Sequence, residues 1–175
     1  MERQRVTDWG ELYRNTFTDL VRYLHRKVWD ADRASDLAQE VFARALQARG
    51  TEAPANPRAW LFRIAANLAH DEARGAIRRR RHLTLLKAES ATSVEPDPLA
   101  GIDRDAREDA ARRALEQLSE RDREVLLLWD AGLSYTEIAE QTELALGAIG
   151  TTLSRARRRL VEAHAELEAR HAARG

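Results

Sequence analysis

Apolar side chains recur every three or four residues along most of this chain, which is the period of an α-helix. The pattern predicts helices over about 8–28 and 32–48, and a third that starts at Pro57 with Asn56 as its cap. Only 8 glycines and 4 prolines interrupt the 175 residues, and no stretch alternates convincingly as a strand. We therefore expect an all-α protein.

The segment 84–105 differs in composition from the rest of the chain. It combines Ser, Thr and the prolines of "EPDP" with an excess of acids, which predicts a flexible linker. The chain would then divide into two small helical domains, a helical bundle over 1–83 and a second domain over 106–170. Domains of this size bury a limited core, so partners are expected to contribute to their stability.

The charges are distributed unevenly. The formal net charge is +0, which by itself argues against a nucleic-acid binder. Arginines nevertheless cluster at 78–81 and again at 155–159, and acids collect between the two clusters. Because local patches set the field that a DNA phosphate experiences, this distribution favours DNA binding at two separate surfaces.

Composition also excludes several classes of protein. Cysteine is absent, which excludes disulfides and cysteine-ligated metals. No apolar run approaches the roughly 20 residues that span a bilayer, and the N-terminal stretch lacks the apolar core of a signal peptide. The sequence thus predicts a cytoplasmic protein with no direct membrane insertion.

The C-terminal part has the pattern of a helix-turn-helix. Ser134 and Glu137 form an S-x-x-E capping box that starts a short helix, and a longer helix follows with a buried stripe of Leu146, Ile149 and Leu153. The second helix of such a motif enters a DNA major groove, and here it would present Thr151, Thr152, Ser154, Arg155, Arg157, Arg158 and Arg159. Arginine can read guanine, Ser or Thr can bond bases, and the run 157–159 suits phosphates. The alternative is a helical hairpin with a solvated basic end.

Three stretches occur in a fixed order along the chain: "DLAQEVFARAL" at 36–46, "RAWLFRIAANLAHDEAR" at 58–74, and "LSERDREVLLLWDAGLSYTEIAE" with "GAIGTTLSRARRRL" within 118–160. They resemble the polymerase-binding helix, the promoter-reading helix and the C-terminal DNA-reading domain of RNA polymerase sigma factors. The specific group is the extracytoplasmic-function (ECF) group of the sigma-70 family. The resemblance covers about residues 10–165. It implies a region 2-like first domain, a region 4-like second domain, and a transcription initiation factor that is not an enzyme and needs no cofactor or metal.

The resemblance further implies that the first domain reads the −10 promoter element and helps to melt it. A flipped base would enter a pocket between the 49–57 loop and the third helix, where Asn67 offers both a donor and an acceptor. The residues implied in −10 DNA binding are Asn56, Trp60, Arg63, Asn67, His70, Asp71, Arg74, Arg78, Arg79 and Arg80. For Trp60, packing in the core is the alternative.

A third implication concerns protein partners. Asp36, Gln39 and Glu40 share one helix face, and with Leu37 this face would dock on the clamp helices of the largest subunit of core RNA polymerase. The second domain would bind the polymerase flap and the −35 element. An anti-sigma factor is also implied; it would hold the chain at the inner membrane where it is itself membrane-bound, whereas active protein would be at the nucleoid. The alternative for 36–40 is an ordinary solvated helix face.

The recognition helix departs from the family pattern. The usual turn glycine is Glu143, the usual cap serine is Ala145, and basic residues are common where Gly150 and Thr152 stand. Gly150 costs about 1 kcal/mol of helix stability relative to Ala, and the lost cap costs about as much. These departures predict a different −35 sequence, or weaker binding that depends more on phosphate contacts.

Other classes of function explain less of the sequence. His70 and Asp71 form a doublet that supplies two ligands in metal phosphohydrolases, but the other histidines form no spaced set of further ligands. A helix-turn-helix regulator that binds duplex operators as a dimer would explain 119–160 but neither 36–42 nor the third helix. A pure interaction protein could use the C-terminal tail. Dependence of promoter binding on core polymerase separates a sigma factor from the regulator.

Overall fold

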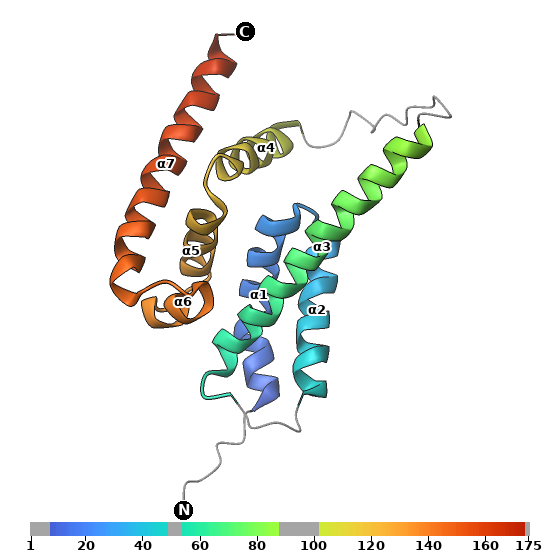
Figure 1. Cartoon of the computed structure of the whole chain (residues 1–175), viewed down its shortest axis with the longest axis vertical. Helices are drawn as coiled ribbons and strands as arrows, with labels where there is room; N and C mark the ends of the chain where they lie inside the picture. Colours follow the sequence, from blue (N-terminus) through green and yellow to red (C-terminus); the bar gives the residue numbers. More distant parts are fainter. Residues whose placement is uncertain (1–7, 49–53, 88–101, 174–175) are drawn as a thin grey trace, which may run out of the picture.

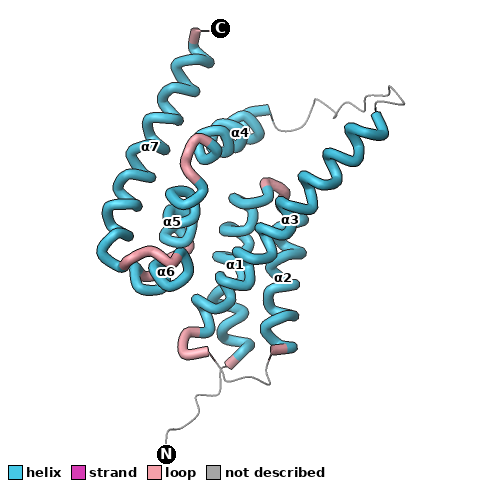
Figure 2. Tube along the Cα trace, in the orientation of Figure 1, coloured by secondary structure: helices cyan, strands magenta, loops and turns pink. Residues whose placement is uncertain are grey.

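The computed structural model describes residues 8–48, 54–87 and 102–173, without the side chains of 77–87, 102–106 and 171–172. These residues form helices and no strands (Figures 1 and 2), which confirms the all-α prediction. The helices are α1 (Trp9–Val28), α2 (Ala31–Gln47), α3 (Pro57–Lys87), α4 (Ile102–Glu116), α5 (Glu120–Asp130), α6 (Tyr135–Thr142) and α7 (Leu146–Ala172). Helices α1–α3 pack together as one group, and α4–α7 as a second group.

The first group is a three-helix bundle whose core comes from the apolar stripe of each helix. The largest fully buried side chains in it are Leu20, Leu24, Leu37, Leu61 and Phe62. Local signals define the helix ends. The carboxylate of Asp8 accepts hydrogen bonds from two backbone N–H groups at the start of α1, and Asp30 accepts one at the start of α2. Between them, Trp29 adopts a left-handed conformation (φ 56°) that ends α1.

Helix α3 begins as the sequence predicts. Pro57 is its first residue, and Oδ1 of Asn56 accepts a hydrogen bond from the Ala59 N–H at 3.0 Å. In Figure 1 the C-terminal part of α3 projects beyond α1 and α2. The helix continues to Lys87 and α4 starts at Ile102, so both ends of the predicted 84–105 linker are helical. The remainder, 88–101, lies outside the described residues.

The second group contains the predicted helix-turn-helix, formed by α6 and α7. The Ser134–Glu137 capping box is present in both directions, and Ile138, Ile149 and Leu153 are buried. The prediction that Leu146 is buried is wrong, because this first residue of α7 lies beside the turn between the two helices, where it is 54% exposed. Helix α6 ends at Thr142, and its C-cap residue Glu143 has a φ of 57°, in the left-handed region where glycine is favoured.

Replacing Gly150 by alanine is expected to stabilise the protein by about 1 kcal/mol, the propensity difference inside a helix. A methyl group there would meet Cε2 of Tyr135 at 3.6 Å, an ordinary contact. Urea unfolding measures the change. Gly132→Ala is the control and is expected to destabilise, because Gly132 has a φ of +84°. A destabilised Gly150→Ala protein would contradict the expectation.

Candidate nucleic-acid interface

Helix α3 presents two different faces. Leu61, Phe62, Ala65, Leu68 and Ala69 are buried against α1 and α2. On the exposed side the helix brings together five of the residues predicted to contact −10 DNA: Arg63, Asn67, His70, Asp71 and Arg74. Arg78, Arg79 and Arg80 follow on the same helix, but their side chains lie outside the described part. One helix therefore anchors itself in the bundle and offers a polar, arginine-containing surface.

Trp60 and Asn56 lie at the start of this helix. The Trp60 ring is half-buried, and it meets the ring of Trp9 edge to face with 6.5 Å between the centroids. It packs against the bundle core, as the alternative for this residue expects. Asn56 is exposed and has two roles: its Oδ1 caps α3, and its Nδ2 donates to the carboxylate of Glu137 on α6.

The second helix group packs against this surface. A guanidinium N–H of Arg63 donates to the Glu140 carbonyl at 3.4 Å, and the side-chain amide of Gln141 donates to the Ala59 carbonyl at 2.9 Å. Asn67 and His70 line a cleft of about 770 Å³ whose opposite wall comes from α4, α5 and α6. In this arrangement the second group faces part of the candidate −10 surface.

Contacts between α1 and α5 hold the two groups together. The Tyr23 hydroxyl donates to a carboxylate oxygen of Glu124 at 2.5 Å, and Lys27 pairs with the other oxygen. Burial, and then the neighbouring Glu124 charge, raise the pKa of Tyr23 well above its ordinary value. Nearby, His25 lies 3.0 Å from the Glu108 carboxylate of α4. Sequence reasoning missed Tyr23 and Glu124, which are 101 residues apart.

Helix α7 carries the residues predicted to contact −35 DNA. Thr151, Ser154, Arg157, Arg158 and Arg159 are exposed, and Arg155 is half-buried. The Thr151 hydroxyl donates to the Ala148 carbonyl at 2.9 Å. The prediction that Thr152 projects outward is wrong, because its helical position turns it into the core, where it is 4% exposed.

The arginines of α7 have different partners. The Arg157 guanidinium lies over the Trp129 ring, 3.8 Å from its centroid. Arg158 is 3.8 Å from Glu162 one turn later, in an exposed pair. Arg155 and Arg159 both bind Asp122, at the start of α5.

Asp122 is a buried carboxylate, with its side chain 1% exposed. Its oxygens accept from Nη2 and Nε of Arg155 at 2.5 and 3.2 Å, and from Nη1 of Arg159 at 3.0 Å. The hydrogen bond from Arg155 is the main cause that holds the pKa of Asp122 below its usual value. Ser119 and Asp122 have the spacing of a capping box, and the Asp122 N–H donates to Ser119 Oγ at 3.1 Å. Nothing local predicts partners 33 and 37 residues away.

This ion pair makes stability depend on pH at the acid end. Because the pKa of Asp122 is lower in the folded than in the unfolded chain, where it is about 3.9, the carboxylate stabilises the fold above that value. The contribution is lost as the pH falls through the folded pKa. We expect Asp122→Asn to lower the free energy of unfolding at pH 7 by about 1–2 kcal/mol, since both arginine partners are partly solvated.

The difference in the free energy of unfolding between wild type and Asp122→Asn should shrink as the pH falls below about 4. Urea unfolding at a series of pH values from 3 to 7 measures it. Glu162→Gln, which removes an exposed carboxylate next to Arg158, serves as the control and should change stability by less than about 1 kcal/mol. A difference in unfolding free energy that stays constant from pH 7 to pH 3 would contradict the stabilising role of the Asp122 carboxylate.

The face of α2 predicted to bind polymerase is only partly as expected. Asp36 and Gln39 are exposed, and Glu40 is half-buried and pairs with Arg44 at 2.6 Å. Leu37 is buried in the bundle core, which contradicts its place on a docking face. Leu37 lies on the apolar stripe of α2 that faces the bundle core, so its side chain cannot also lie on the exposed face of the helix.

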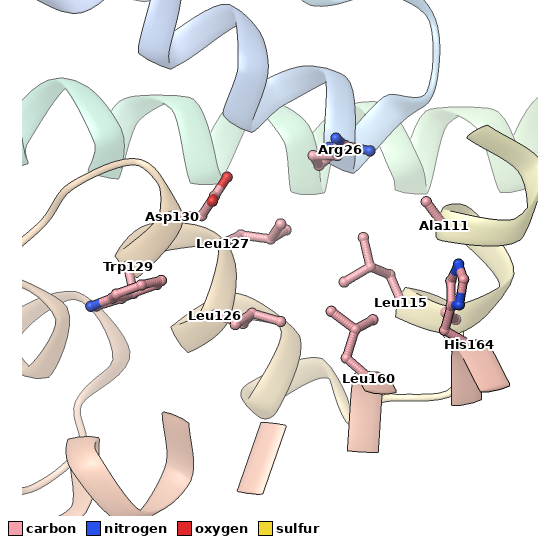
Figure 3. A pocket seen from close by; sticks show the side chains of 10 residues that line it. Arg26, Ala111, Leu115, Leu126, Leu127, Trp129, Asp130, Leu160 and His164 are labelled. Atoms are coloured by element: carbon pink, nitrogen blue, oxygen red, sulfur yellow. The ribbon is translucent and has the colours of Figure 1, made fainter. Parts of the chain in front are cut away.

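The second helix group also has an apolar hollow of about 260 Å³ (Figure 3). Its lining includes four leucines: Leu115 of α4, Leu126 and Leu127 of α5, and Leu160 of α7. Arg26 of α1 lies at its edge in Figure 3. A hollow of this kind can accept an apolar side chain from a partner.

Among the described residues, no group of three or more His, Asp or Glu side chains could hold a metal ion. None of the described helices is both long and apolar enough to cross a membrane.

Comparisons with known proteins give the same family for both helix groups. Sigma-70 region 2 matches residues 12–82, and sigma-70 region 4 matches residues 108–160. The chain is 31% identical over 150 residues to RNA polymerase sigma factor YlaC of Bacillus subtilis, and the aligned region covers 84% of this chain and 86% of that protein. It is 35% identical over 133 residues to ECF RNA polymerase sigma factor EcfG of Rhodopseudomonas palustris, covering 75% and 71%.

A solved structure with a similar fold is that of the sigma factor RpoE in complex with the anti-sigma factor NepR from Bartonella quintana. The TM-score is 0.62 at 26% sequence identity, and the match covers 90% of this chain and 97% of that one.

Proposed function

Since the chain belongs to the sigma-70 family of RNA polymerase sigma factors, in its extracytoplasmic-function group, we propose that it directs core RNA polymerase to promoters by reading a −10 and a −35 element. Sigma factors initiate transcription without catalysing a reaction themselves, and we expect the same of this chain. The observation that carries the proposal is the two-faced helix α3, with an apolar face in the bundle and five polar candidate residues on the other.

We assign −10 reading and melting to that exposed face. Asn67 offers an amide donor and acceptor to the edge of a flipped base. Arg63 and Arg74 are exposed on the same helix and can hold phosphates. Trp60 supports this face by packing against Trp9 and the bundle core.

We assign −35 reading to the exposed face of α7. Thr151 and Ser154 are the exposed hydroxyl side chains that can meet base edges there. Arg157, Arg158 and Arg159 suit phosphate contacts, which set position without reading sequence. Arg155 keeps the edge formed by Nη1 and Nη2 for DNA, because Asp122 occupies the edge formed by Nε and Nη2.

Polymerase binding is assigned to both helix groups. Asp36, Gln39 and Glu40 offer an acidic and polar face on α2 for the clamp helices of the largest subunit. For the flap, the apolar hollow between α4, α5 and α7 is the surface that fits best, because an apolar partner segment can fill it (Figure 3).

The packed arrangement supports dependence on polymerase. Arg63 and Asn56 contact α6, and Asn67 lines the cleft between the two helix groups. DNA can reach this surface fully only if the groups separate. We infer that core polymerase, by binding each group at its own site, holds them apart. The chain alone should then bind promoter DNA poorly, unlike a classical regulator.

We also propose that an anti-sigma protein binds the inactive chain. The RpoE–NepR complex, whose sigma factor has a fold similar to that of this chain, supports the proposal. Affinity purification from unstressed cells tests this. A dedicated protein recovered in stoichiometric amount supports it, and recovery of the chain alone or with polymerase only counts against it.

Replacing Asn67 by alanine is expected to change base preference at one −10 position by about 10-fold, within the 1–3 kcal/mol of a good base contact. Transcription from promoters carrying each −10 variant measures this. Asn15→Ala, the same change at an exposed site on α1, should leave every preference unchanged. Equal losses on all variants would reject the role of Asn67 in reading.

A further inference from the structure

The Asp122 cluster is a group of three charges, in which a buried carboxylate binds two of the arginines assigned above to −35 DNA. Asp122, at the first turn of α5, binds Arg155 and Arg159, which are one turn apart on α7. The carboxylate is 1% exposed, whereas the arginine side chains are 41% and 50% exposed. The arginines therefore reach solvent on the DNA-reading helix, and their common partner is buried behind them.

The geometry decides what these arginines can still do. Arg155 uses Nε and Nη2 on Asp122, one of the two guanidinium edges that could form a bidentate contact with guanine. Arg159 uses Nη1. One carboxylate thus occupies both side chains and offsets one of their two positive charges.

Arg158 gives the contrast within the same helix. Among the described residues it pairs with Glu162, 3.8 Å away, and the two side chains are 71% and 61% exposed. Exposed pairs at this separation hold a side chain weakly. Arg158 can move to a phosphate at little cost, whereas Arg155 must first leave a short, shared and buried partner.

We propose that Asp122 is a specificity-determining residue of the second helix group: it restrains Arg155 and Arg159 so that α7 does not bind every duplex through phosphate attraction. Discrimination between sequences then depends on Thr151 and Ser154. This inference rests on the proposed −35 role of α7, but the masking of charge is measurable on any duplex.

The test uses the full chain and a 20-base-pair duplex of random sequence, with binding followed by fluorescence anisotropy over a series of salt concentrations. Asp122→Asn should bind several-fold more tightly at low salt. The slope of log K against log salt should steepen by about 0.9, the value for one additional phosphate contact. Glu162→Gln makes the same change in net charge and should alter both quantities less.

A second pair of variants does not depend on tolerance of the change at Asp122. In the wild-type background, Arg155→Gln should leave the salt slope for the random duplex nearly unchanged. Arg158→Gln should make it shallower by about 0.9. Equal reductions of the salt slope in Arg155→Gln and Arg158→Gln would overturn the proposal. Equal increases in affinity for Asp122→Asn and Glu162→Gln would overturn it as well.

The same variants then separate this inference from the function on which it rests. With core polymerase, Asp122→Asn should lower the ratio of transcription from the cognate promoter to that from one with a scrambled −35 element. If the chain supports no transcription but the random-duplex results hold, the masking by Asp122 stands and the sigma function fails. If transcription occurs but the salt slopes do not change, the masking fails alone.

Discussion

Replacing Phe62 by alanine is expected to destabilise the protein by about 3–5 kcal/mol, the range for truncating a buried phenylalanine. Phe62 is fully buried in the bundle, where its ring meets that of Tyr23 edge to face with 5.4 Å between centroids. The loss approaches the whole stability of a small domain. Urea unfolding followed by circular dichroism should show that the α1–α3 bundle unfolds at a much lower urea concentration. Transcription should fall with it.

Arg63→Ala is the matched control, because it changes the next residue along α3 on the exposed face. Its effect on stability should stay within about 1 kcal/mol, while it weakens binding of −10 DNA in the polymerase complex. Similar losses of stability for the two variants would contradict the separation of α3 into an anchoring face and a DNA face.

Replacing Glu124 by lysine is expected to separate the two helix groups. Glu124 accepts from Tyr23 and pairs with Lys27, so the change removes both contacts and places like charges together. Without polymerase, binding of a single-stranded −10 oligonucleotide should tighten by about 10-fold or more, which corresponds to 1.4 kcal/mol. Small-angle scattering should report a larger radius of gyration.

Glu116→Lys makes the same charge change at a residue that lines the same cleft, but Glu116 pairs with Arg112 of its own helix. It should leave the radius of gyration unchanged and alter DNA binding only through its charge. If both variants tighten binding equally and neither expands the chain, the packing of the groups does not limit access to the −10 surface.

Local signals in the sequence predict the elements of the fold well. The Pro57 start and Asn56 cap of α3, and the capping box of Ser134 and Glu137, depend on residues within one turn of each other. Such interactions are fixed by spacing alone. The same holds for the exposed face of α3, which follows from helical period once the buried residues are identified.

Individual residues at the edge of a stripe are harder to assign. Thr151 and Thr152 are neighbours of the same type, and about 100° of helix rotation separates the exposed one from the buried one. Leu37 stands between polar residues of a docking face but belongs to the core. The contacts of Asp122 with Arg155, and of Glu124 with Tyr23, join residues 33 and 101 positions apart. Only the packing of whole helices brings these pairs together.

The most direct test of the account is transcription in vitro by core RNA polymerase, with and without this protein, on a pool of genomic fragments. The account predicts new transcripts whose start sites share a −10 and a −35 element, and loss of these transcripts when either element is scrambled. No new transcripts, together with tight binding of the chain to duplex DNA in the absence of polymerase, would contradict it and indicate a classical regulator.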